Sequence, residues 1–209
     1  MDWTALYLKT SGLKVFILGT GEVATRRANR FLDHGASVKL AGSSISDELL
    51  EKGAELHSTD EVDGLVEWCD LVVVASGDKE LCEYVSDISG EKLVNRADEP
   101  DLGDIIVPTS FNIGDVEISI FTGGKSPLMA RQLRKKIQSL ITEEDILEIE
   151  LQDYSRSLLK EIIPNQKDRR NYLYKIFDDE NIQNLIKSRE IDEAKAVICE
   201  LIKGDFNDT

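Results

Sequence analysis

Residues 14–28, KVFILGTGEVATRRA, decide the fold of the N-terminal half of the chain. The apolar run from Val15 to Leu18 predicts a strand that ends at Gly19, and a segment of helical composition follows Gly21. In such a strand–turn–helix unit the first glycine permits a tight turn, and the second lets the backbone approach a pyrophosphate. The N–H groups and the positive dipole end of the helix then favour the diphosphate. The stretch therefore predicts a dinucleotide site, and the alternative is a Rossmann-like domain with an empty site.

Strand-like and helix-like segments alternate through the first half of the chain. Such alternation is typical of a parallel sheet covered by helices, so the predicted fold class is α/β. The predicted strands are Lys14–Leu18, Ser37–Ala41, Glu55–His57, Leu71–Ala75 and Lys92–Asn95. The predicted helices are Val23–His34 (ended by Gly35), Ser46–Lys52 and Lys79–Ser89.

The ends of two predicted strands bear on cofactor binding. The apolar run Leu71–Ala75 predicts a central strand that is buried on both faces and ends at Ser76 and Gly77. Because ligands bind at the carboxyl ends of strands in open α/β sheets, we expect both residues beside the cofactor. The second strand lacks the usual ribose-binding acid and ends in Ala41-Gly42-Ser43-Ser44 instead. The candidates for holding the ribose are therefore the hydroxyls of Ser43 and Ser44 or the backbone, and the preference for NAD or NADP stays open.

The pattern changes after Pro100. Two runs predict an antiparallel pair joined by a turn at 112–115, and a helix with Ser126 as its cap follows. From Thr142 the chain is predicted to be helical, with a break at Pro164. The predicted strands are Asp104–Phe111 and Val116–Phe121, and the predicted helices are Pro127–Leu140, the segment from Thr142 to Pro164, Asp168–Phe177, Asp179–Ser188 and Ile191–Ile202, with a stop at Gly204 and a frayed tail.

Composition excludes several classes of protein. The 209 residues carry a net charge of -15, which argues against broad nucleic-acid binding because that needs a basic footprint. No run of about 18 apolar residues predicts a membrane span, and the first ten residues, MDWTALYLKT, do not form a signal peptide. The three cysteines, Cys69, Cys82 and Cys199, are not spaced as zinc ligands. We therefore expect free thiols in the cytoplasm and no resident metal site.

Four stretches together resemble the precorrin-2 dehydrogenases, the dehydrogenase and chelatase module of siroheme synthases. They are ALYLKTSGLKVFILGTGEVATRRANRFLDHGASV, DLVVVASGDKELCEYVS, LVNRADEPDLGDIIVPTSF and ISIFTGGKSPLMARQLRKKI. The resemblance implies that NAD⁺ takes a hydride as precorrin-2 is oxidised to sirohydrochlorin; some members of the family also insert Fe²⁺ to give siroheme. It further implies a homodimer with an NAD-binding Rossmann domain over 1–103, a dimerisation and substrate segment (β-hairpin and helix) over 104–141, and a helical domain over 142–209.

The same resemblance assigns candidate site residues by position. It matches Glu22, Val23, Ser43 and Ser44 to family positions that contact the cofactor. Together with the motif glycines and the residues after the central strand, the cofactor set is Gly19, Gly21, Glu22, Val23, Ser43, Ser44, Ser76 and Gly77. Asp98 matches the aspartate that the family uses in both reactions, and a carboxylate there can accept or relay a proton. Without the resemblance, Asp98 is also explained as a turn residue beside Pro100.

A second glycine motif, Thr122-Gly123-Gly124, follows the second strand of the predicted antiparallel pair, and basic residues near it are candidates for binding substrate. Precorrin-2 is a polycarboxylate, so an acidic chain must offset the repulsion with local cations. Lys125 and Arg131 lie in a stretch without acids, whereas the later lysines are explained as a solvated helix face. The substrate set is Thr122, Gly123, Gly124, Lys125, Ser126, Arg131 and Arg96.

Departures from the family pattern keep alternatives open. Ser76-Gly77-Asp78 replaces a family threonine and aspartate, and Arg96 stands close to Asp98. Two roles are open for Arg96, namely binding substrate or lowering the pKa of Asp98. The rivals to the enzyme are a nucleotide-sensing regulator and a non-catalytic relative that binds tetrapyrrole, nucleotide or a pathway enzyme. Nothing in the sequence separates a monofunctional dehydrogenase from one that is also a ferrochelatase.

Overall fold

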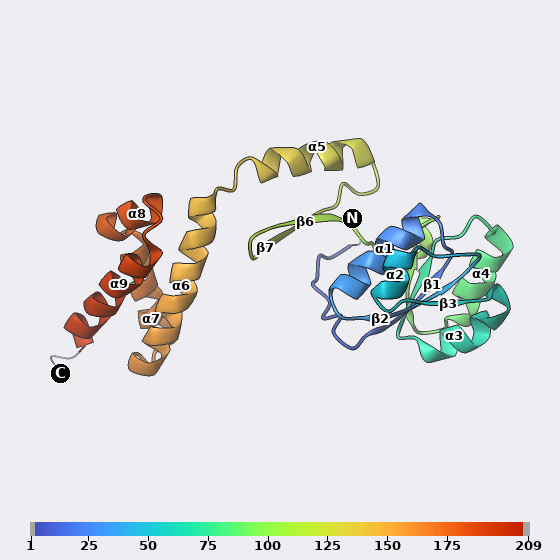
Figure 1. Cartoon of the computed structure of the whole chain (residues 1–209), viewed down its shortest axis with the longest axis horizontal. Helices are drawn as coiled ribbons and strands as arrows, with labels where there is room; N and C mark the ends of the chain where they lie inside the picture. Colours follow the sequence, from blue (N-terminus) through green and yellow to red (C-terminus); the bar gives the residue numbers. More distant parts are fainter. Residues whose placement is uncertain (1–2, 207–209) are drawn as a thin grey trace. The chain divides into compact units, whose positions relative to one another are not determined.

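The computed structural model describes residues 3–206. It divides into two compact units, Met1–Pro108 and Thr109–Thr209, each with its own packing (Figure 1). The predicted domain limits near 103 and 141 stay predictions.

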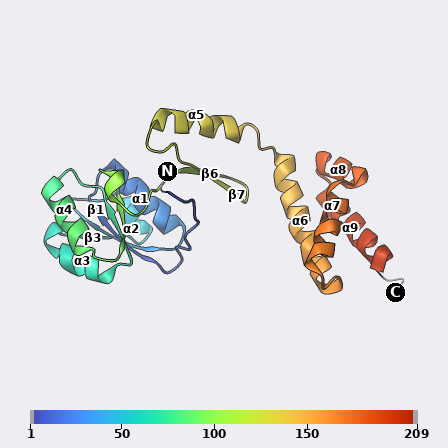
Figure 2. The same cartoon turned by 180° about the vertical axis from the view of Figure 1, so that it is seen from behind.

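The first unit is built on a parallel five-stranded sheet with the order β3-β2-β1-β4-β5. Helices α1 and α2 pack on one face of this sheet, and α3 and α4 pack on the other (Figures 1 and 2). The strands are β1 (Lys14–Leu18), β2 (Ser37–Ala41), β3 (Glu55–His57), β4 (Leu71–Val74) and β5 (Leu93–Arg96). The helices are α1 (Glu22–Asp33), α2 (Asp47–Glu51), α3 (Val62–Trp68) and α4 (Lys79–Ile88), with short 3₁₀ turns η1 (Thr59–Glu61) and η2 (Pro100–Leu102). The predicted α/β class is confirmed.

Strand β1 shows why the apolar runs form a central sheet. Val15 and Ile17 pack with α1 and α2, whereas Phe16 and Leu18 pack with α3 and α4. Successive side chains of a strand point to opposite faces, so only a continuous apolar run can fill both layers. Strand β4 is likewise buried at every position, as its sequence predicts.

Helix α3 is an element that the sequence reading missed. Its apolar residues Val62, Leu65 and Val66 have helical spacing and are buried against the sheet. Just before α3, the η1 turn begins with a capping box in which Ser58 and Glu61 exchange hydrogen bonds. The helix is short and contains Gly64, and both features weaken a helical pattern in sequence.

The second unit begins with a β-hairpin that is shorter than predicted. Strands β6 (Thr109–Ile113) and β7 (Val116–Ile120) pair around a turn at Gly114 and Asp115. The prediction that the first of these strands starts at Asp104 is wrong. The N–H groups of Asp104 and Ile105 both donate to the Val94 carbonyl, so this segment stays attached to β5.

The rest of the second unit is helical, as the prediction states. The helices are α5 (Pro127–Gln138), α6 (Glu143–Ile162), α7 (Gln166–Phe177), α8 (Glu180–Lys187) and α9 (Ile191–Phe206). The predicted cap at Ser126 is confirmed, since Ser126 accepts from Met129 N–H at the start of α5. Thr142 forms a capping box with Asp145 at the start of α6. None of the helices in residues 3–206 combines the length and apolar character that a membrane crossing requires.

Helix α9 continues past the predicted stop at Gly204, so that part of the prediction is wrong. Its last residues have partners on α7. The ring centroids of Phe206 and Tyr172 lie 5.4 Å apart, and Asp205 accepts hydrogen bonds from Tyr172 and Lys175. These contacts stabilise the last turn against the cost of a helical glycine. Residues 207–209 of the predicted frayed tail lie outside the described residues.

The strand order reverses between β1 and β4, and the two strand ends meet there through Gly19. Gly19 has φ +109°, and a Cβ on it would lie 2.3 Å from the Ala75 carbonyl oxygen. An alanine would therefore be strained in its backbone and would push the strand ends apart.

Gly19→Ala is expected to lower the free energy of unfolding by about 3 kcal/mol or more, combining backbone strain with overpacking. Urea denaturation of the full chain measures it. Gly64→Ala is the matched control, because a Cβ at that α3 position meets nothing within 4 Å. A wild-type midpoint for Gly19→Ala would contradict this account.

Candidate functional site

The predicted cofactor residues and Asp98 lie at the carboxyl edge of the same sheet. All five strands are parallel, so the segments that follow β1, β2, β4 and β5 emerge at one edge. Hydrogen bonds extend the pairing beyond the strands: Gly19 N–H donates to the Ala41 carbonyl, and Ala97 N–H donates to the Val74 carbonyl, both over 2.9 Å. In an open α/β sheet this edge binds ligands where the strand order reverses.

The start of α1 is suited to hold a pyrophosphate. Gly21 is the N-cap, and no side chain caps the first-turn N–H groups. A Cβ on Gly21 would meet nothing within 4 Å, and its φ of -76° suits any residue. The protein itself therefore does not require a glycine there, which leaves the space for a ligand. The free N–H groups and this space fit a dinucleotide diphosphate.

Three further residues of the motif lie in the first turn of α1. Ala24 is fully buried between α1 and the sheet, as the third small residue of the motif should be. Glu22 is exposed in the first turn and pairs with Arg26 over 3.3 Å, and Val23 is half-buried.

Hydroxyl groups stand where the usual ribose-binding acid is missing. Ser43 and Ser44 follow β2 and are exposed, and Ser43 Oγ lies 3.5 Å from Thr20 Oγ1. A Cβ on Gly42 would lie 2.6 Å from Thr20 Cγ2, so Gly42 makes room for this threonine. The sequence reading missed Thr20, although its place between the two motif glycines could have drawn attention to it.

The segment after β4 is partly structural. Asp78 accepts the Leu81 N–H over 3.1 Å and caps α4, and Ser76 Oγ accepts the Asp78 N–H over 3.2 Å. A Cβ on Gly77 would meet nothing within 4 Å, so the edge is open at this position.

Asp98 and Arg96 form a two-point ion pair at the end of β5. Arg96 Nε donates to Asp98 Oδ1 over 2.9 Å, and Arg96 Nη2 donates to Asp98 Oδ2 over 2.7 Å. Arg96 is buried, whereas the Asp98 side chain keeps 22% of its surface exposed. The hydrogen bond with Arg96 lowers the pKa of Asp98 below its ordinary value and raises that of Arg96.

The second glycine motif forms a closed loop in the second unit. Thr122 Oγ1 lies 3.4 Å from the Ser126 nitrogen and 3.3 Å from the Ser126 carbonyl oxygen, and it bonds to both. Gly123 and Gly124 have positive φ values of 66° and 71°, which favour glycine. The remaining predicted substrate residues, Lys125 and Arg131, are exposed, and neither forms an ion pair within residues 3–206.

Similarity to known proteins identifies the family of this chain. Residues 6–109 match the family described as "Putative NAD(P)-binding". Precorrin-2 dehydrogenase of Methanosarcina barkeri is 32% identical over 195 residues, which cover 88% of this chain and 86% of that protein. The chain belongs to the precorrin-2 dehydrogenase family. The predicted resemblance and the predicted nicotinamide dinucleotide cofactor are thereby confirmed.

Two further likenesses agree with this family. The solved structure of SirC, a precorrin-2 dehydrogenase, matches with a TM-score of 0.74 and 25% identity, covering 93% of this chain and 99% of that one. The siroheme synthase of Pseudomonas paraeruginosa is 28% identical over 210 residues, and this chain spans only 45% of its length.

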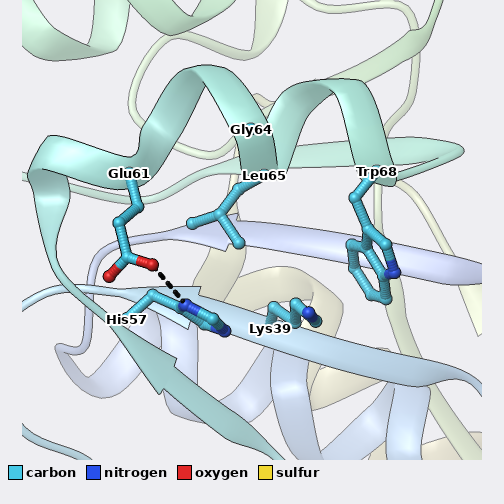
Figure 3. Close-up of a pocket in the computed structure, with 6 residues that line it drawn as sticks. All are labelled: Lys39, His57, Glu61, Gly64, Leu65 and Trp68. Carbon is cyan, nitrogen blue, oxygen red and sulfur yellow. Dashed lines mark hydrogen bonds and ion pairs between the residues drawn. The ribbon is translucent and has the colours of Figure 1, made fainter.

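A separate cavity of about 390 Å³ lies between β2, β3 and α3 (Figure 3). None of the predicted site residues lines it; its lining is Lys39, His57, Glu61, Gly64, Leu65 and Trp68. The polar groups pair with one another: His57 Nδ1 lies 3.0 Å from Glu61 Oε2, and Lys39 Nζ lies 4.6 Å from the centroid of the Trp68 ring. His57 thus links β3 to η1.

Gly21→Ala is expected to weaken NAD⁺ binding about tenfold or more, since the added methyl group would occupy the space beside the pyrophosphate at a cost of about 1–3 kcal/mol. Calorimetric titration with NAD⁺ measures the affinity. The thermal unfolding midpoint of Gly21→Ala should equal that of the wild type, whereas Gly19→Ala should be destabilised. Wild-type affinity in Gly21→Ala would remove this glycine from the cofactor site.

Proposed function

We propose that this chain catalyses the NAD-dependent oxidation of precorrin-2 to sirohydrochlorin in siroheme biosynthesis. The carrying observation is the position of Asp98, a carboxylate at the same sheet edge as the pyrophosphate cradle of Gly19 and Gly21. Membership of the precorrin-2 dehydrogenase family supports the substrate. Anaerobic incubation of precorrin-2 with NAD⁺, followed by the absorbance of sirohydrochlorin, tests the proposal.

The reaction removes one hydride, with its electron pair, and one proton from the reduced tetrapyrrole. The chemistry that bound NAD⁺ supplies is acceptance of the hydride. Positive charge develops on the macrocycle as the hydride leaves, and the Asp98 carboxylate stabilises that charge electrostatically. Its two oxygens can also accept a hydrogen bond from the substrate while they accept from Arg96, because each oxygen has two lone pairs.

Cations of the second unit are proposed to bind the substrate carboxylates. Lys125 and Arg131 are exposed and have no acid partner within the described range. Arg131 can offer a bidentate fork to a carboxylate. Thr122, Gly123, Gly124 and Ser126 are proposed to shape the loop that receives the substrate. The chain carries a net charge of -15, so these local cations are needed to offset repulsion.

The α1 helix supplies a further cation. Arg27 is half-buried, its Nε has no hydrogen-bond partner among the described residues, and it lies near Arg26 and Arg30. Burial, followed by repulsion from these two arginines, lowers its pKa to about 10. It remains charged at neutral pH, which supports an anionic ligand on this side of α1.

We further propose a cytoplasmic homodimer. Helix α5 exposes Leu128, Met129 and Leu133, an apolar surface that a second copy of the chain would cover. The free thiols Cys69, Cys82 and Cys199 suit a reducing compartment.

Ferrochelation is a second candidate activity, with Fe²⁺ as substrate, and the likeness to siroheme synthases favours it. Iron insertion into supplied sirohydrochlorin, measured by absorbance, separates the two activities. A folded chain that yields no sirohydrochlorin from precorrin-2 and NAD⁺ would favour the non-catalytic alternative, a relative that binds tetrapyrrole, nucleotide or a pathway enzyme.

Asp98→Asn is expected to lower kcat about 10²–10⁴-fold, because the carboxylate charge is lost while hydrogen bonding to Arg96 is kept in part. NAD⁺ affinity should not change. Stopped-flow absorbance of NADH measures turnover, and Asp101→Asn in η2, which is exposed, is the matched control. Full turnover by Asp98→Asn would exclude Asp98 from the mechanism.

Arg131→Gln is expected to raise KM for precorrin-2 about tenfold with a smaller change in kcat, since it removes a charge-assisted hydrogen bond to a substrate carboxylate. Steady-state kinetics at low and high salt measure the effect, which should shrink at high salt. Lys135→Gln, on the last turn of the same α5 helix, is the control. Equal KM values for the two variants would count against a specific role for Arg131.

A further inference from the structure

We propose that Arg96 is a positioning residue for Asp98: its guanidinium holds the carboxylate in one orientation and keeps it as a fixed anion instead of a carrier of the reaction proton. This inference rests on the proposed function, in which Asp98 stabilises the charge that develops on the substrate. Of the two roles open from the sequence, binding substrate and acting on Asp98, the geometry favours the second.

The backbone brings the two side chains together. Arg96 ends β5, the Ala97 N–H still pairs with the Val74 carbonyl of β4, and the chain then bends over residues 97–99. The Asp98 carboxylate lies within this bend and meets the Arg96 fork directly. The two hydrogen bonds, of 2.9 and 2.7 Å, occupy one lone pair on each carboxylate oxygen and fix its plane.

A third contact holds the guanidinium itself. Arg96 Nη1 donates to Ser86 Oγ over 3.3 Å, and the Ser86 hydroxyl donates to the Cys82 carbonyl over 2.9 Å within α4. With 4% of its surface exposed, Arg96 is anchored between β5 and α4. It cannot reach a substrate carboxylate without breaking all three contacts.

The surroundings of the pair make Arg96 the dominant charge on Asp98. Besides Arg96, the titratable groups that act on the pair are Cys82 on α4 and Glu99 beside Asp98 in the chain, and Asp78 at the α4 cap acts on Cys82. Burial first, and then the charge of Asp98, raises the pKa of the Cys82 thiol, so Cys82 stays neutral. Arg96 is therefore the one cation among these groups, and it opposes the negative charges around Asp98.

A fixed anion suits the proposed reaction. Removal of a hydride leaves positive charge on the macrocycle, and a preorganised carboxylate stabilises it without reorganisation. The pKa of Asp98 lies below its ordinary value, so the group remains ionised throughout the neutral range. The proton that leaves the macrocycle then passes to solvent, because Asp98 is too weak a base to retain it.

The test compares Arg96→Met with Arg96→Lys in the full chain. A ¹³C NMR titration of the Asp98 carboxyl, assigned by difference with Asp98→Asn, gives its midpoint without any substrate. The midpoint should rise by about one pH unit or more in Arg96→Met, since an adjacent arginine lowers an aspartate pKa by about that much. The acid limb of the kcat–pH profile should move in the same direction.

Arg96→Lys separates charge from orientation. Lysine keeps the positive charge but lacks the planar fork, so the midpoint should stay near wild type while kcat falls about tenfold or more. Lys92→Met is the matched control, because Lys92 bonds the Cys69 carbonyl at the other end of β5 and does not touch Asp98. Lys92→Met should change neither the Asp98 midpoint nor kcat. Wild-type affinity for NAD⁺ shows that each variant is folded.

An unchanged Asp98 midpoint in folded Arg96→Met would overturn the inference. If Arg96→Met does not fold, Arg96→Lys decides: wild-type kcat overturns the positioning role, and reduced kcat at a wild-type midpoint supports it. Failure of the wild-type chain to oxidise precorrin-2 would instead refute the proposed function, and the substrate-free titration would still report whether Arg96 controls Asp98.

Discussion

The close approach of β1 and β4 at Gly19 is the constraint on which the site depends. The absent side chain of Gly19 lets the Ala75 carbonyl come to where a Cβ would stand, 2.3 Å from it. The turn into α1, which carries the uncapped N–H groups, follows the end of β1, and Ser76 and Gly77 follow the paired end of β4 at the same sheet edge. A bulkier residue would separate the two halves of the sheet at the point where the strand order reverses, which is where an open α/β sheet binds its ligand.

The parallel sheet then brings distant parts of the sequence to one edge. Asp98 is far from Gly21 in the chain, yet β5 pairs with β4 and β4 pairs with β1, so the segments that follow these strands share an edge. The apolar runs that fill both faces of the sheet set the register, since a slip by one residue would turn every buried side chain to the other face. The core and the candidate site are therefore consequences of the same strand pairing.

The sequence predicted the elements that carry strong local patterns, and it failed where long-range contacts decide. The strands β1 and β4 are continuous apolar runs, and the caps Ser126 and Thr142 are local, so all of these could be predicted. Helix α3 was missed because it is short and contains Gly64. The segment from Asp104 was mistaken for hairpin because its bonds to Val94 are not visible in a pattern. The place of Thr20 and the partner of Arg96 could not be predicted for the same reason, because the direction of a side chain at a strand end depends on the fold around it.

The Arg96–Asp98 pair also makes folding and the proposed catalytic role depend on the same carboxylate. A buried guanidinium is costly unless it is paired and hydrogen-bonded, and removing its partner costs about 3–5 kcal/mol in comparable buried pairs. Asp98→Ala would leave the buried Arg96 with only the Ser86 hydroxyl as a side-chain partner, so its loss of activity would mix misfolding with lost chemistry. Asparagine keeps a carbonyl oxygen that can accept from the guanidinium, which is why the amide and not the methyl group isolates the role of the charge. The same reasoning explains why an arginine is tolerated in the interior beside α4: the carboxylate to which we assign the catalytic role is also the group that neutralises it.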